Sequence, residues 1–216
     1  MATEPGTTGI DADSISLVKR AKAGELAAFE ELVRHHERLV YSLARRILQN
    51  EHDAEDVTQQ TFLSAVEHLG GFREESSFST WLLRIATHAA LKVIRKRRGL
   101  DTTSLDAATE PQEGYESIAH PEYIADWSSS PDRLARRSET LRLIEEALGQ
   151  LDEKHRLVFL LRDVEGLSVK ETAETLALSE VNVKVRLLRA RLQLRERLTR
   201  TLGDPARQVV REKHAH

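Results

Sequence analysis

A row of basic side chains recurs at intervals of four, four and three residues: Arg84, His88, Lys92 and Arg95. A helix places positions with this spacing on one face. Such a row can bind the phosphates of a nucleic acid over much of one DNA turn, because a helix from about Ser77 to Arg98 is roughly 30 Å long. For the closing cluster Arg95-Lys96-Arg97-Arg98 alone, a basic helix end that offsets the helix dipole is the alternative.

The loop before this row carries aromatic and polar side chains. They are Phe72, Arg73, Ser76, Ser77 and Phe78. Aromatic rings can stack on unpaired bases, and the polar groups can form hydrogen bonds to them. Capture of a single strand is therefore a hypothesis for this loop.

The stretch from Leu167 to Arg191 has the proportions of a helix-turn-helix. Ser168 and Glu171 have capping-box spacing, and after a short connection Ser179 can cap a second helix. In this motif the start of the second helix faces base edges, and flanking basic residues contact phosphates. The candidates are Ser179, Asn182, Lys184, Arg186, Arg189 and Arg191. Spacing alone leaves a solvated amphipathic helix as the alternative.

Charge is segregated along the chain, although the formal net charge is only −3. Residues 101–132 contain eight acids and no Lys or Arg, whereas residues 184–200 contain seven Lys or Arg and one acid. This separation indicates distinct acidic and basic functions, and the basic stretches favour a nucleic-acid partner.

Several other classes of chemistry have no support. The chain has no cysteine, which excludes disulfides and thiolate metal sites. Its nine histidines are scattered, and no metalloprotease motif, phosphate loop or paired nucleophile and base is present. His214 and His216 are only a weak metal candidate. With no apolar leader or membrane-length apolar run, we expect a cytoplasmic protein that is no enzyme and needs no cofactor.

The elements that position these residues are predicted to be all-α, with two small helical domains. The boundaries are a disordered leader at 1–13, a helical domain at 14–98, an extended acidic linker at 99–137, a helix-turn-helix domain at 138–202, and a tail at 203–216 without an assigned role. The predicted apolar stripe of the helix from about Ser77 to Arg98 is Phe78, Trp81, Leu82, Ile85, Ala89 and Val93, opposite the basic row. Asp152 is expected to cap the second helix of the C-terminal domain.

Three motifs, in order, resemble the extracytoplasmic-function branch of the sigma-70 family of bacterial transcription initiation factors. The first begins Asp53-Ala54-Glu55-Asp56-Val57 and continues through Gln59, Thr61, Phe62 and Leu63. The second runs from Phe72 to Ala86, and the third runs from Gly166 to Arg191. The short spacer, with no third domain, is typical of this branch.

The resemblance implies binding to core RNA polymerase and to promoter DNA. The residues implied for the clamp helices of the largest polymerase subunit are Asp53, Asp56, Gln59, Phe62 and Leu63, although Phe62 and Leu63 fit a core role equally well. The loop at 72–78 and the basic row would bind the minus-ten element. The helix-turn-helix would bind the minus-thirty-five element, and the polymerase flap is a further implied contact.

The resemblance also implies an anti-sigma partner. It further implies that the acidic linker threads toward the RNA exit path of the polymerase; the alternative for the linker is a solvated tether. Departures fall on the positions implied to face DNA: His88 replaces a common Asn, Lys92 replaces a common acid, and residues 181–185 differ from Gly-Thr-Val-Lys-Ser. Two other functions stay open. One is an autonomous helix-turn-helix regulator, and the other is a helical adaptor that binds only protein.

Overall fold

The computed structural model describes residues 8–99 and 141–202, and within these ranges every regular element is a helix. The all-α prediction is confirmed for this part of the chain. The predicted acidic linker, apart from Gly99, and the predicted tail lie outside the described residues. No helix in the described ranges is long and apolar enough to cross a membrane.

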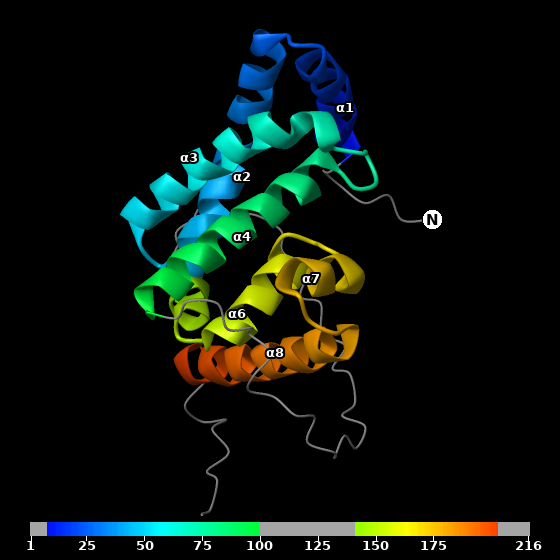
Figure 1. Cartoon of the computed structure of the whole chain (residues 1–216). Coiled ribbons are helices and arrows are strands. Elements are labelled where there is room, and N and C mark those ends of the chain that lie inside the picture. The colour runs from blue at the N-terminus through cyan, green and yellow to red at the C-terminus, as the bar shows by residue number, and fades with distance from the viewer. Residues whose placement is uncertain (1–7, 100–140, 203–216) are drawn as a thin grey trace, which may run out of the picture.

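The N-terminal half is a bundle of α1 (Thr8–Lys22), α2 (Leu26–Leu48), α3 (Glu51–His68) and α4 (Phe78–Arg97). Figure 1 shows α3 and α4 crossing in front of α2. Gly24, with a φ of +92°, allows the sharp turn between α1 and α2. Helix α1 begins within the stretch predicted to be a disordered leader, because burial of Leu17 and Val18 fixes the helix and each further turn adds backbone hydrogen bonds.

Side-chain caps fix the start of the two helices that carry most of the candidate residues. The Asn50 side chain accepts a hydrogen bond from the Asp53 N–H at 3.0 Å, and α3 begins directly afterwards. The Ser77 hydroxyl accepts from the Thr80 N–H at 3.0 Å and caps α4. Each cap satisfies a backbone donor that has no partner within its helix.

The buried face of α4 differs from the predicted apolar stripe. The buried residues are Phe78, Leu82, Leu83, Ala86, Thr87, Ala90, Leu91 and Ile94. Trp81, Ile85, Ala89 and Val93 are half-buried and pack against the core, so the predicted stripe forms the edge of the buried face and not its centre. The basic row is adjacent to these four residues and not opposite them. A step of three residues, as from Ile85 to His88, turns the helix by about 300°, which leaves the two positions about 60° apart.

The C-terminal half contains a helical segment at 141–149, α6 (Glu153–Phe159), a π-helical turn (Leu160–Val164), α7 (Val169–Leu176) and α8 (Glu180–Leu202). The capping box before α7 is confirmed: Ser168 Oγ accepts from the Glu171 N–H at 3.1 Å, and the Ser168 N–H donates to Glu171 Oε2 at 2.7 Å. The Ser179 cap is also confirmed by the Asn182 N–H at 3.2 Å.

Asp152 stands at the N-terminus of α6, but its side chain makes no capping hydrogen bond, so that prediction was wrong. One of its carboxylate oxygens instead lies 3.7 Å from Nδ1 of His155. At this distance the two groups form no hydrogen bond, and the Asp152 side chain stays 69% exposed.

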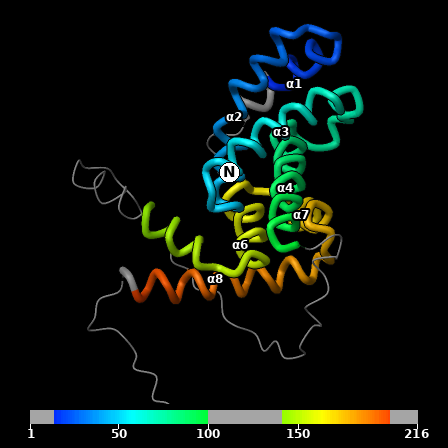
Figure 2. The backbone as a smooth tube through the Cα atoms, turned by 60° about the vertical axis from the view of Figure 1, so that its left-hand side comes forward, coloured from blue at the N-terminus to red at the C-terminus, as the bar shows by residue number. Residues whose placement is uncertain are grey.

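The two halves are in contact. In Figures 1 and 2, α6 and α7 lie between the N-terminal bundle and α8, which runs across the far side of the molecule. Helix α7 packs against α4, and α6 with the π-helical turn packs against α2. The face of α4 that carries the basic row is therefore next to the helix-turn-helix.

Candidate nucleic-acid interface

One face of α3 presents both polar and apolar side chains to solvent. Asp56, Gln59, Leu63 and Val66 follow at intervals of three, four and three residues, and all four are exposed. Leu63 is 57% exposed and Val66 is 47% exposed, which is unusual for two neighbouring aliphatic side chains. An exposed apolar pair with a polar border is typical of a surface that binds another protein.

The other two residues predicted for this surface hold the bundle together. The Asp53 carboxylate pairs with Arg97 of α4, and Phe62 is buried in the core. Val66 was not predicted, although it continues the row from Gln59 and Leu63 at helical spacing. Helical spacing places Val66 on the same face as Leu63. The sequence did not decide whether Leu63 is exposed or in the core, so it did not indicate that Val66 is exposed either.

The aromatic residues of the predicted single-strand site form a cluster inside the bundle. The rings of Phe72 and Phe78 lie 5.9 Å apart, and the Trp81 ring lies 5.1 Å from Phe72 and 5.6 Å from Phe78. Phe72 and Phe78 are buried, and Lys22 Nζ covers the Phe72 ring at 5.4 Å. Burial favours a core role for both phenylalanines, which leaves half-buried Trp81 as the accessible aromatic ring.

The polar residues of the same loop differ in accessibility. Arg73 is exposed, whereas Ser76 and Ser77 are half-buried. The Ser77 hydroxyl is already engaged as the cap of α4 and also donates to Thr80 Oγ1 at 3.0 Å. Arg73 is therefore the predicted loop side chain best placed to meet a phosphate.

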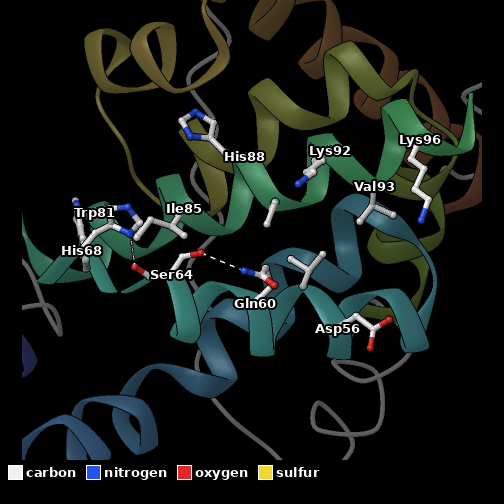
Figure 3. A pocket seen from close by; sticks show the side chains of 12 residues that line it. Asp56, Gln60, Ser64, His68, Trp81, Ile85, His88, Lys92, Val93 and Lys96 are labelled. Carbon is white, nitrogen blue, oxygen red and sulfur yellow. Dashed lines mark hydrogen bonds between the residues drawn. The ribbon is translucent and has the colours of Figure 1, made fainter. Parts of the chain in front are cut away.

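A groove of about 760 Å³ runs between α3 and α4 (Figure 3). Its apolar lining is formed by Val57, Trp81, Ile85, Ala89 and Val93. His88, Lys92 and Lys96 border it along α4, and Asp56, Gln60, Ser64 and His68 border it along α3. Gln60 Nε2 donates to Ser64 Oγ at 3.3 Å, which orders the polar side. A groove with apolar walls and a cationic border can hold the bases of a single nucleic-acid strand while the cations contact its phosphates.

The basic row of α4 is split between two environments. Lys92 and Arg95 are exposed. Arg84 instead pairs with Glu174 of α7, and His88 Nε2 lies 2.9 Å from the Thr175 carbonyl oxygen. The first half of the row therefore makes contacts with α7, although His88 itself is exposed, whereas the second half is exposed without a contact of this kind in the described residues.

Three of the helix-turn-helix candidates have structural partners or are buried. Ser179 caps α8, Arg186 is buried, and Arg191 forms two hydrogen bonds to Asp163, at 2.7 and 2.8 Å. The hydrogen bonds that the Arg191 guanidinium donates to the Asp163 carboxylate raise the pKa of Arg191. This ion pair ties α8 to the π-helical turn, so Arg191 supports the domain in the described state.

The remaining candidates lie at the surface of α8. Lys184 is exposed, and Asn182 and Arg189 are half-buried. Val181, which was not predicted, is 63% exposed in the first turn of the same helix. An apolar side chain at the start of a recognition helix can contact the methyl group of thymine. Its position two residues after the Ser179 cap, in the first turn of the helix, could have indicated this exposure from the sequence.

Two family models match the chain in the order of these sites. Sigma-70 region 2 matches residues 32–99, and Sigma-70, region 4 matches residues 141–194. The ECF RNA polymerase sigma factor SigW of Bacillus subtilis is 33% identical over 181 residues, which cover 84% of this chain and 94% of SigW. The chain belongs to the extracytoplasmic-function branch of the sigma-70 family.

Solved structures agree with this sigma-factor assignment. CnrH in complex with the cytosolic domain of CnrY is 30% identical, has a TM-score of 0.58, and matches 88% of this chain and 99% of CnrH. The sigma factor RpoE of Bartonella quintana, in complex with the anti-sigma factor NepR, has a TM-score of 0.55, and the match covers 79% of this chain and 96% of RpoE. At 22% identity, RpoE supports the fold alone.

His155 and Glu165 are among the buried titratable side chains of region 4. Burial lowers the pKa of His155, and the nearby Asp152 carboxylate only partly opposes this effect. Burial raises the pKa of the Glu165 carboxyl group, against the opposing effect of Arg46 from region 2. Both groups are kept toward their neutral forms by desolvation.

Proposed function

We propose that this sigma factor binds core RNA polymerase through α3, reads a minus-thirty-five element with α8, and captures the melted minus-ten element at α4. The observation that carries the proposal is the set of three separate surfaces on one chain: the exposed apolar face of α3, the cationic groove beside α4, and the first turns of α8. An autonomous regulator would need only the last of these surfaces.

For polymerase binding, the proposed contacts are Asp56, Gln59, Leu63 and Val66. The two aliphatic side chains supply apolar area, and the polar pair can set orientation on the partner. Asp53 and Phe62 act indirectly: the Asp53 ion pair to Arg97 and the buried Phe62 ring fix how α3 presents this face. The partner we propose is the pair of clamp helices on the largest polymerase subunit.

For the minus-thirty-five element, the proposed contacts are Val181, Asn182, Lys184 and Arg189. The α8 N-terminus, capped by Ser179, orients these side chains toward the major groove. Lys184 and Arg189 would contact phosphates, whereas Val181 and Asn182 would contact base edges. The proposal assigns Ser179, Arg186 and Arg191 to support within region 4.

For the minus-ten element, the proposed surface combines Arg73, Lys92, Arg95 and Lys96 with the Trp81 ring in the α3–α4 groove. The cations would follow the phosphates of the non-template strand, and Trp81 would stack on an unpaired base. Each captured base offsets a few kcal/mol of unstacking, which favours the melted form of the promoter. The chain would act by binding alone, without catalysis or a cofactor.

We also propose a regulatory protein partner, because CnrH, a relative over nearly its whole length, was solved in complex with the cytosolic domain of CnrY. The exposed apolar face of α3 is a suitable target for such a partner, since covering it would prevent polymerase binding. A cytoplasmic location follows from the proposed binding to RNA polymerase.

Open-complex formation tests the proposal. Promoter DNA that carries a fluorescent base analogue in the minus-ten element is mixed with core polymerase, with and without the chain. We expect the fluorescence of unstacking only when both proteins are present, and a smaller signal with Lys92→Ala. Specific duplex binding by the chain alone, with no unstacking when polymerase is added, would support an autonomous regulator instead.

A further inference from the structure

Lys22, the last residue of α1, reaches the loop between α3 and α4, fifty residues further along the chain. Its Nζ donates a hydrogen bond to the Phe72 carbonyl oxygen and lies 5.4 Å from the centre of the Phe72 ring. The same Nζ lies 4.0 Å from Glu74 Oε1, and the Lys22 side chain is only 25% exposed. One ammonium group therefore contacts the backbone, the ring and a carboxylate of this loop.

The loop at 72–77 has few other interactions that fix its backbone. It follows a 3-10 turn (Leu69–Gly71) that packs against α1, and Figure 1 shows the loop beside that helix. Residues 73–76 form no backbone–backbone hydrogen bond with any described residue. Glu74 has a φ of +59°, a left-handed conformation that is unfavourable for a residue with a Cβ atom. Such a conformation persists where surrounding contacts hold it, and Lys22 supplies two of them, at Phe72 and at Glu74.

Phe72 connects Lys22 to Trp81. The Phe72 ring lies 5.1 Å from the Trp81 ring. Phe78, the other aromatic neighbour of Trp81, is fixed by its place in α4 and by the His36 ring of α2, which lies 5.1 Å away. Phe72 belongs to no helix, so the place of its ring depends on how the loop is held. The contacts of Lys22 therefore bear on the Trp81 ring through Phe72.

We propose that Lys22 is a positioning residue for the minus-ten surface: it holds the loop at 72–77 so that the Phe72 ring supports Trp81 in the α3–α4 groove. The inference deepens the proposed function and rests on it for the stacking of a base on Trp81. Lys22 precedes residues 32–99, which the region 2 model matches. Because its ammonium group is engaged by Phe72 and Glu74, Lys22 acts on DNA through the loop and contacts no phosphate itself.

Trp81 reports the anchoring in the full-length chain without polymerase or DNA. The chain has two tryptophans, so Trp127→Phe in the predicted linker leaves Trp81 as the single fluorophore. In this background we expect Lys22→Met to raise the acrylamide quenching constant of Trp81, because a loosened Phe72 ring uncovers it. Lys22→Arg keeps a cation that can donate to the carbonyl and lie over the ring, and it should restore the wild-type constant. Lys19→Met is the matched control, since it removes the same charge from an exposed position of α1.

Binding of fork-junction DNA by the holoenzyme measures the consequence for the minus-ten element. The DNA carries a single-stranded minus-ten element, and the chain is added in excess to core polymerase. We expect Lys22→Met to weaken binding by about three- to tenfold, the effect of one lost structural hydrogen bond, and Lys22→Arg and Lys19→Met to stay within about twofold of the wild type. In the Trp81→Ala background, Lys22→Met should cause little further loss, because Lys22 acts through that ring.

The salt dependence of the same binding separates positioning from a direct DNA contact. Lys22→Met should leave the slope of log K against log salt concentration unchanged, whereas loss of a phosphate contact reduces the slope by about one. A reduced slope, or a loss of affinity that adds fully to that of Trp81→Ala, would make Lys22 a DNA contact and overturn the proposal.

The fluorescence and binding results together decide the proposal. Higher quenching and weaker DNA binding with Lys22→Met, both reversed by Lys22→Arg, would support it. Unchanged quenching and affinity would overturn it. A loss of helical content or of affinity for core polymerase that Lys19→Met does not share would also overturn it, because Lys22 would then stabilise the whole bundle. A failure of open-complex formation with the expected quenching response would instead refute the proposed function alone.

Discussion

Truncation of Leu63 should weaken polymerase binding without affecting the fold. Leu63 is 57% exposed, so a partner can bury a little more than half of its surface. Full burial of a leucine side chain contributes about 1.5–3 kcal/mol. The part that remains for a partner is therefore about 1–1.5 kcal/mol, and we expect Leu63→Ala to raise the Kd by about five- to twelvefold.

Leu63→Glu should weaken binding further, because a carboxylate in the contact loses its hydration. The assay is fluorescence anisotropy of the labelled chain titrated with core polymerase. Leu26→Ala is the control, since Leu26 is 68% exposed in the same bundle but lies on α2 and not on the α3 face. Wild-type affinity for both Leu63 variants would refute the proposed role of α3.

Three further predictions concern region 4. Lys184→Ala should weaken DNA binding to all minus-thirty-five sequences alike, and it should reduce the slope of log K against log salt concentration by about one. Filter binding measures both effects, and an unchanged slope would show that Lys184 contacts no phosphate. Ser168→Ala should lower the free energy of unfolding in urea by about 1 kcal/mol, because it removes the cap of α7. Ser42→Ala, inside α2, removes no cap and should lower it by at most about 0.5 kcal/mol. Equal losses of stability would contradict the role of the Ser168 cap. The pKa of His155 is lowered in the folded state. As the pH falls below about 6.5, His155 therefore binds a proton in the unfolded chain before it does so in the folded chain. The free energy of unfolding should fall from that pH downward until the folded pKa is passed. His155→Gln should remove this part of the pH dependence, and parallel curves of unfolding free energy against pH for the two proteins would disprove it.

The two serine-capped helix starts of region 4 could be predicted, because their determinants are local. The Ser168–Glu171 capping box and the Ser179 cap each involve residues three positions apart, and both occur as predicted. The helix-turn-helix that they delimit followed from the same short-range pattern. Fold class could likewise be predicted, since helical periodicity extends over nearly every described residue.

The accessibility of the candidate side chains could not be predicted, because their partners are distant in sequence. Arg191 bonds to Asp163, 28 residues away, and Arg84 pairs with Glu174, 90 residues away. Nothing in the spacing of basic residues distinguishes these two from exposed Lys92 and Lys184. Only the packing of one helix against another decides which cations remain at the surface.

The aromatic residues illustrate the same point. Phe72 and Phe78 flank a polar loop, which suggested exposed stacking surfaces, yet both rings are buried against each other and against Trp81. A loop of polar residues between two buried rings has the same composition as a loop with exposed rings. The burial of the Phe72 and Phe78 rings, on either side of this polar loop, follows from how α4 packs in the bundle.

Run-off transcription tests the central claim most directly. Core polymerase is supplied with a library of promoters randomised at the minus-thirty-five and minus-ten elements, with and without the chain. We predict full-length transcripts that depend on the chain and that share two sequence elements at a fixed spacing. Transcripts equal in amount and sequence with and without the chain would contradict its proposed action at both elements.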